Sequence, residues 1–214
     1  MSILLPVPPD RRLRRLGQLY PGLAIYGFST ALLVRANLGL NPWDVFHQGV
    51  SVRSGFSLGM VTIATSAVVL LLWIPIRQRL GVGTISNGIL IGVFVDLSLH
   101  FLPTPNDVAL RVGFLIAGIL LNGFATGLYI GAGLGPGPRD GLMTGLARDG
   151  RSIRVARTSI EVTALVFGWL LGGSVGVGTV AYALAIGPLA HVLIPALTVG
   201  TPAMSGRPED HAAT

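Results

Sequence analysis

Cysteine is absent from this 214-residue sequence, and so is lysine. Without thiols the chain can form no disulfide, no thiolate metal site, no iron–sulfur cluster and no cysteine nucleophile. Charged residues are also scarce, at 11% of the chain, whereas apolar residues make up 51%. This balance argues against an ordinary water-soluble domain and is typical of a protein that is solvated by lipid.

Six apolar segments are long enough, or nearly so, to cross a membrane as helices. A hydrocarbon core about 30 Å thick requires roughly 20 mostly apolar residues. Only helices and closed barrels satisfy their backbone groups there, and the alternating pattern of barrel strands is absent. We therefore predict an all-α, polytopic membrane helical bundle with spans at residues 16–34, 58–76, 82–102, 112–134, 158–173 and 177–199.

The fifteen basic residues are all arginines, and their positions predict the orientation of the chain. Loops rich in basic residues stay on the cytoplasmic side of a membrane. If the N-terminus is cytoplasmic, twelve arginines lie inside and three lie outside, namely Arg35, Arg53 and Arg111. We therefore predict a membrane protein with both termini in the cytoplasm, a basic segment at 1–15 and a disordered tail at 201–214. The expected surroundings are the lipid bilayer, and no nucleic-acid partner is expected.

The second half of the sequence repeats the first at an offset of 96 residues. The segment LGLNPWD at 38–44 aligns with LGPGPRD at 134–140, and after a one-residue slip GVGT at 81–84 aligns with GVGT at 176–179. We predict two membrane repeats, 16–107 and 108–200, with three spans each. Because three is odd, the repeats are inverted. Inverted repeats are characteristic of secondary transporters, whose binding sites lie near the middle of the membrane where the repeats meet.

Each repeat contains a loop that follows a glycine with the pattern Pro-x-Asp. These residues suit the start of a short helix, because proline fits the first turn and aspartate complements the positive end of the helix dipole. One interpretation is a plain corner between helices with a capping carboxylate. The other is a pair of re-entrant half-helices, one from each membrane face, that bind an anionic or zwitterionic solute. The candidate binding residues in these loops are Asn41, Asp44, Gly137, Arg139 and Asp140.

Two further candidates, Asp96 and His191, occupy equivalent positions in the aligned repeats. Ionisable groups inside a membrane are costly, which makes them candidates for function. They either take part in a proton relay through water or solute, or they hydrogen-bond neighbouring helices and fix the packing. Glu161 has a simpler interpretation, because it can pair with Arg157 one helical turn earlier.

Other polar residues indicate packing, and catalytic patterns are missing. Asn87 and Asn122 are expected to hydrogen-bond between helices. The zinc-protease motif HExxH is absent, no serine lies in a nucleophile-elbow pattern, and the glycine-rich loops lack the Walker lysine. We therefore expect no enzymatic activity, no metal and no cofactor.

Four segments are similar to one bacterial family: LGLNPWDVFHQG at 38–49, WIPIRQRLGVGT at 73–84, LGPGPRDGLMTGL at 134–146 and IRVARTSIE at 153–161. Over residues 20–195 the chain resembles the YczE/YyaS/YitT family of integral membrane proteins, most closely its YczE-like branch. This resemblance implies a multi-pass protein of the bacterial plasma membrane that is often treated as a transporter. It supplies no catalytic residues.

Two functional hypotheses follow. The first is a transporter of a small anionic or zwitterionic solute that uses the two Pro-x-Asp loops and the region around Asp96 and His191. The alternative is a non-transporting membrane scaffold or accessory protein that binds a partner complex. Small inverted-repeat proteins often need a second copy to enclose a pathway, so a homodimer is compatible with the first hypothesis.

Overall fold

Eight helices form the part of the chain that the structure, a computed structural model, describes: residues 4–147 and 152–200. No described residue lies in a β-strand, and the all-α prediction is confirmed. The predicted tail at 201–214 lies outside the described residues. The helices are α1 (Arg12–Ala36), α2 (Pro42–Ser54), α3 (Leu58–Leu72), α4 (Val82–Phe101), α5 (Val108–Gly131), α6 (Pro138–Leu146), α7 (Ile153–Leu170) and α8 (Val177–Leu197).

Three of these helices, α4, α5 and α8, are long and apolar enough to cross a membrane by length and composition. The pair α2 and α3 adds a fourth candidate, with a bend of 115° between its two parts. Many large apolar side chains are exposed on the outer surface, among them Val180, Leu184 and Val192 of α8. Such a surface suits lipid, because soluble proteins rarely expose contiguous apolar patches of this kind.

The six predicted spans overlap the six longer helices, but α1 and α7 are not among the helices that are long and apolar enough to cross a membrane. One predicted span also differs clearly in length from its helix. The span predicted at 58–76 ends early, because α3 stops at Leu72 and residues 73–77 form turns. Pro75 lies in this segment. It has no backbone N–H to donate to a further helical turn. The two short helices, α2 and α6, begin at Pro42 and Pro138, where the Pro-x-Asp pattern predicts helix starts.

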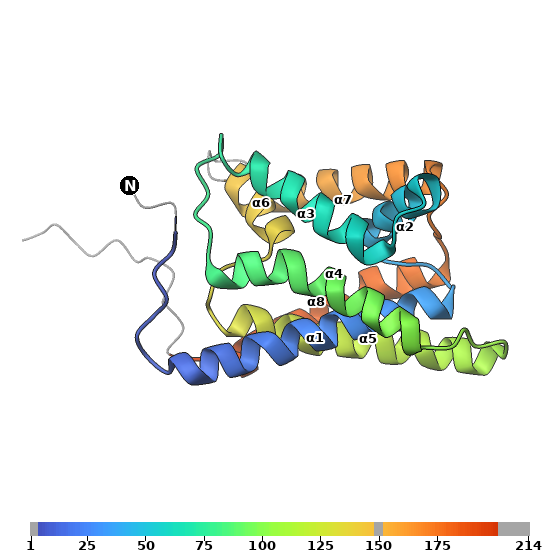
Figure 1. Cartoon of the computed structure of the whole chain (residues 1–214), viewed down its shortest axis with the longest axis horizontal. Coiled ribbons are helices and arrows are strands. Elements are labelled where there is room, and N and C mark those ends of the chain that lie inside the picture. The colour runs from blue at the N-terminus through green and yellow to red at the C-terminus, as the bar shows by residue number, and fades with distance from the viewer. Residues whose placement is uncertain (1–3, 148–151, 201–214) are drawn as a thin grey trace, which may run out of the picture.

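The order of helix types in the first half recurs in the second half. Helices α5, α6, α7 and α8 each begin 95 or 96 residues after α1, α2, α3 and α4, respectively. In Figure 1, α1 and α4 run in one direction along the molecule, whereas α5 and α8 run in the opposite direction. Each helix of the first half therefore has a counterpart at the offset that the sequence alignment predicts.

Two arginines make reciprocal contacts at the ends of the central pair, α1 and α5. Arg15, near the start of α1, donates from Nη1 to the carbonyl of Ala132 just after α5, at 2.9 Å. Arg111, near the start of α5, donates from Nε to the carbonyl of Ala36 at the end of α1, at 2.8 Å. Terminal helix carbonyls lack partners within their own helix, and a cation also complements their negative dipole. The contacts fix α1 and α5 as an antiparallel pair.

Arg15 also bonds to the segment that precedes α1. Its Nη2 lies 2.7 Å from a carboxylate oxygen of Asp10. This hydrogen bond lowers the pKa of the Asp10 carboxyl below its ordinary value. Arg15 therefore ties the N-terminal segment to the same end of the molecule as the end of α5.

The two GVGT segments make a second pair of reciprocal contacts. The Gly83 N–H at the start of α4 donates to the Leu134 carbonyl at 2.8 Å, and the Gly178 N–H at the start of α8 donates to the Leu38 carbonyl at 2.7 Å. Each short-helix loop is thereby held by the long helix of the other half. The alignment that defines the repeat thus marks the contacts between the two halves.

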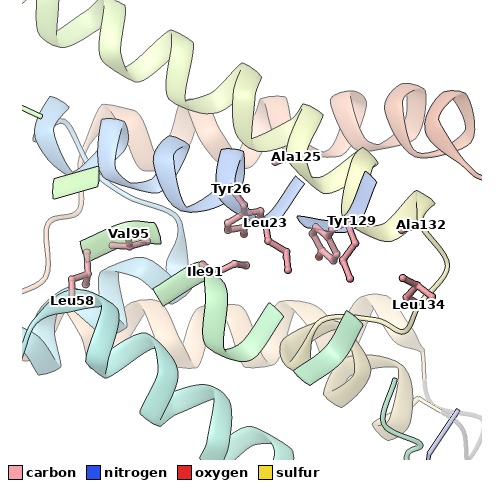
Figure 2. Close-up of a cluster of buried hydrophobic side chains, with 10 residues drawn as sticks. Leu23, Tyr26, Leu58, Ile91, Val95, Ala125, Tyr129, Ala132 and Leu134 are labelled. Atoms are coloured by element: carbon pink, nitrogen blue, oxygen red, sulfur yellow. The ribbon is translucent and has the colours of Figure 1, made fainter. Parts of the chain in front are cut away.

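A buried apolar cluster joins α1, α4 and α5 (Figure 2). Its fully buried members include Leu19, Leu23 and Val95. The rings of Tyr26 and Tyr129 meet edge to face, with centroids 6.0 Å apart. Edge-to-face pairs of this kind add to the stabilisation that burial alone provides. Three members of the cluster, Tyr26, Ile91 and Tyr129, line one side of a cavity between the two halves.

Candidate functional site

A cavity of about 310 Å³ lies where helices of the two halves meet. Both Pro-x-Asp loops contribute to its wall, together with α1, α4, α5, α7 and α8. The two loops are separated by about a hundred residues in sequence, but they face one common space. The polar and charged residues that line it are Tyr26, Asn41, Asn87, Tyr129, Arg139, Asp140, Arg157, Glu161 and Tyr182.

The first loop builds a well-defined start for α2. Asn41 is the N-cap residue, and its side-chain oxygen accepts a hydrogen bond from the Asp44 N–H at 3.0 Å. Its amide nitrogen donates to Asp44 Oδ2 at 2.6 Å. Pro42 occupies the first turn, where its missing N–H costs nothing. This geometry satisfies the capping interpretation, and it also holds Asp44, which is only 3% exposed, beside the cavity.

The second loop begins α6 with a different set of contacts. Gly137 is the N-cap, so no side chain caps this helix. The Tyr129 hydroxyl donates to Asp140 Oδ2 at 2.7 Å. The indole of Trp73 donates to the Pro138 carbonyl at 3.0 Å. The start of α6 is therefore held by residues from α5 and from the end of α3.

Arg139 lies at the centre of this arrangement. Its guanidinium carbon lies 5.5 Å from the ring centroid of Trp43, which is its counterpart in the first Pro-x-Asp loop. The charges of Asp44 and Asp140 both act on it. It makes no hydrogen bond and no ion pair within 4.0 Å with any residue that the structure describes. A guanidinium carries five N–H donors. Arg139 thus places unused donors at the cavity wall.

Arg157 and Glu161 form an ion pair at the α7 side of the cavity. Arg157 Nε lies 2.9 Å from Glu161 Oε1, one helical turn away. The predicted pairing of these two residues is confirmed. Because the pair is exposed to a large extent, its contribution to stability is small.

Asn122 confirms the expectation of a hydrogen bond between helices, whereas Asn87 lies in the cavity wall. Asn122 is fully buried. It donates to the Ser29 hydroxyl at 2.9 Å and accepts from the Tyr182 hydroxyl at 2.7 Å. This network joins α1, α5 and α8 beneath the cavity. It also orients Tyr182, which lines that cavity.

The structure does not bring Asp96 and His191 into the cavity. Asp96 accepts from the Ser57 hydroxyl at 2.5 Å and from the Gly59 N–H at 2.7 Å. It therefore accepts from one of the free N–H groups at the start of α3, that of Gly59. His191 is exposed on α8. The five candidates from the two loops are brought together at or beside one cavity, and the other two are not.

Several residues at the site carried no signal of their own in the sequence. Tyr26, Tyr129 and Tyr182 lie within apolar runs, where an isolated tyrosine is typical of ordinary helix packing. Trp43 and His47 lie in the LGLNPWDVFHQG segment, but the sequence does not show which face of the helix each residue occupies. The one available signal is the alignment of the two loops, which places Trp43 opposite Arg139.

Comparison with known proteins gives the family but no activity. A model described as a family of unknown function (DUF6198) matches residues 13–195. A protein of Haemophilus influenzae, called an uncharacterized protein, is 41% identical over 173 residues, which cover 80% of this chain and 79% of the relative. The uncharacterized membrane protein YczE of Bacillus subtilis is 31% identical, covering 82% of this chain and 83% of its own length.

A third relative is more distant, and no solved structure matches. The uncharacterized protein YyaS of Bacillus subtilis is 26% identical, covering 81% of this chain and 89% of its own length. These relatives agree with the resemblance to YczE-like proteins. The chain belongs to the DUF6198 family and is a relative of the uncharacterized membrane protein YczE.

Proposed function

We propose that the chain crosses the bacterial plasma membrane six times as two inverted repeats, with α2 and α6 as half-helices. The reciprocal contacts of Arg15 and Arg111, and of the two GVGT segments, support a two-fold relation between the halves. In Figure 1, the start of α1, the α3–α4 connection and the α5–α6 connection lie at one end of the molecule. Six arginines lie at the start of α1 or in the α3–α4 connection, namely Arg11, Arg12, Arg14, Arg15, Arg77 and Arg79. The positive-inside rule assigns that end to the cytoplasm.

We further propose that the chain binds and transports a small solute that carries an anionic group, and that Arg139 receives this group. The observation that carries the proposal is the Arg139 guanidinium, which has no hydrogen-bonding partner among the described residues and lies in a cavity built by both halves. Such a site lies where inverted-repeat transporters bind their solutes. A planar guanidinium also matches a carboxylate in a bidentate geometry.

The charges around the cavity favour a zwitterion over a simple anion. Two arginines, Arg139 and Arg157, stand against three carboxylates, those of Asp44, Asp140 and Glu161. Asp140 has one oxygen bonded to Tyr129, so the other is free to accept from a cationic group of a solute. A solute with both charges therefore satisfies Arg139 and Asp140 together. A lone anion adds to the excess negative charge, whereas a zwitterion leaves the net charge unchanged.

A panel of small probes tests this proposal. Glycine, β-alanine and glycine betaine represent zwitterions, with acetate, ethylamine and glycerol as the anionic, cationic and neutral members. We expect at least one zwitterion to raise the unfolding temperature of the purified protein, because a ligand at a hundredfold excess over its Kd stabilises by about 2.7 kcal/mol. Glycerol and ethylamine are expected to have no effect. The strongest stabiliser is then tested for uptake into proteoliposomes.

The opposite pattern would count against a solute site. If the zwitterions behave like glycerol at every concentration, Arg139 does not bind this class of solute. A stoichiometric protein that copurifies with the chain under those conditions would favour the scaffold alternative. Binding without uptake would retain the site but remove the transport step.

A further inference from the structure

Helix α2 buries an acid and a base, Asp44 and His47, that do not line the cavity of the proposed solute site. Asp44 is 3% exposed and His47 is 2% exposed. Nδ1 of His47 lies 3.4 Å from Asp44 Oδ1, one helical turn away. Buried ionisable groups inside a membrane protein are costly, and they commonly mark ion or proton pathways. His47 is not explained by helix capping, because Asn41 already caps α2.

The acceptors around His47 favour a hydrogen on Nδ1 of its ring. The Thr62 hydroxyl donates its single hydrogen to the Leu58 carbonyl at 2.9 Å. Its oxygen lies 3.3 Å from His47 Nδ1 and can accept from that nitrogen, and the Asp44 carboxylate, 3.4 Å from Nδ1, can only accept. Nδ1 thus bears a hydrogen that points toward Thr62 and Asp44. In the neutral ring, Nε2 then has a free lone pair that can take up a second proton.

The other charged and titratable groups near this pair come from the helices around it. Helix α6 contributes Arg139, whose charge acts on both Asp44 and His47, and Asp140. Helix α7 contributes the Arg157–Glu161 ion pair, which is already internally balanced. Helices α1 and α8 contribute tyrosines, and α3 contributes Thr62 but no ionisable group. Arg139 is therefore the principal cation that lines the cavity and also acts on Asp44.

The second half of the chain has no equivalent base. At the repeat offset, the counterpart of Asp44 is Asp140, but the counterpart of His47 is Met143, which lines the cavity. The two half-helices are therefore alike in their carboxylates and different in their capacity to accept a proton. Among the described residues, a half-helix with both a carboxylate and a histidine therefore occurs once per chain.

We propose that the Asp44–His47 pair binds a proton that is coupled to the solute at Arg139; this inference rests on the proposed function. A proton from water forms a bond to Nε2, and Asp44 holds the resulting imidazolium through Nδ1–H. When the anionic group of a solute pairs with Arg139, Asp44 loses its shared cation. The imidazolium then becomes the cation that balances Asp44. Solute and proton therefore bind cooperatively, and by linkage each strengthens the binding of the other.

The proton itself serves as the probe, so the experiment needs no identified solute. A protein with His100→Gln, His191→Gln and His211→Gln retains His47 as its single histidine, and nitrogen-15 NMR of the labelled ring in lipid nanodiscs reports its state. We expect a neutral ring with Nδ1–H at pH 8 and a reversible change to imidazolium by pH 5. A ring that stays neutral throughout this range overturns the proposal.

Two substitutions test the coupling. Asp44→Asn should reduce the ratio of imidazolium to neutral ring at a fixed pH, on the order of tenfold, because an opposite charge in contact typically has an effect of this size. Arg139→Ala imitates a neutralised guanidinium and should raise that ratio. An unchanged ratio in Arg139→Ala overturns the coupling even if Asp44→Asn fails to fold. A normal titration together with an inert solute panel would instead refute the proposed function and retain the proton site.

Discussion

Replacing Gly39 or Gly135 with alanine is expected to destabilise the protein by about 3 kcal/mol or more, because two separate costs add. Both glycines adopt positive φ, +111° and +115°, which an L side chain rarely tolerates. At Gly39 a Cβ atom would also lie 2.6 Å from the Gly176 backbone nitrogen, and at Gly135 it would lie 2.9 Å from the Gly81 Cα. Backbone atoms at the junction between the halves cannot move aside without breaking the GVGT contacts.

Alanine substitutions at two other glycines allow the backbone strain and the steric clash to be measured separately. Gly55 has φ +75°, and a Cβ atom added there would meet nothing within 4 Å, so Gly55→Ala isolates the backbone strain, about 1 kcal/mol. Gly113 is helical and open, so Gly113→Ala should be neutral or slightly stabilising. Denaturation in detergent micelles measures the free energy of unfolding of all four variants. If Gly39→Ala costs no more than Gly55→Ala, the loop of the first half does not pack on the start of α8 as described.

Arg139→Ala is expected to weaken binding of the zwitterion from the probe panel about a hundredfold. Truncating one partner of a buried charged hydrogen-bonded pair typically costs about 2 to 5 kcal/mol. Arg139→Lys should retain part of the affinity, because it keeps the charge but loses the bidentate geometry. Isothermal titration calorimetry measures the Kd of the zwitterion for both variants. The matched control is Arg154→Ala on α7, an exposed arginine that does not line the cavity, and it should bind as the original protein does.

The stability of Arg139→Ala distinguishes a binding role from a structural one. Arg139 makes no hydrogen bond or ion pair with the described residues, and its ring contact with Trp43 contributes about 0.5 to 2 kcal/mol. Removing it also removes the cost of a desolvated charge. We therefore expect little change in unfolding temperature without ligand. A large loss of stability together with unchanged affinity would contradict the assignment.

The helices and the two short-helix starts could be predicted from the sequence because their causes are local. Continuous apolar runs predict spans, and proline followed by aspartate predicts a helix start. The repeat alignment also predicted that 38–44 and 134–140 are equivalent. It could not show that the two loops face one cavity, because that depends on how α4 and α8 pack against the loop of the opposite half.

Asp96 illustrates why a functional residue cannot be identified from its type alone. An aspartate within an apolar run suggests function, but its partners Ser57 and Gly59 lie nearly forty residues earlier. Only the packing of α3 against α4 brings its carboxylate to the start of α3. His47 is the opposite case, since its burial and its contact with Thr62 depend on a helix face that the sequence does not reveal.

The meeting of the two Pro-x-Asp loops is the claim on which the rest depends, and cross-linking tests it most directly. The chain has no cysteine, so Trp43→Cys with Arg139→Cys provides a single reactive pair. Because the native side chains are in contact across the cavity, a bismethanethiosulfonate with a one-methylene spacer should link the two positions within one chain in high yield. The control pair is Trp43→Cys with His191→Cys, since His191 lies outside the cavity. A yield for the first pair no greater than that for the control would contradict the account.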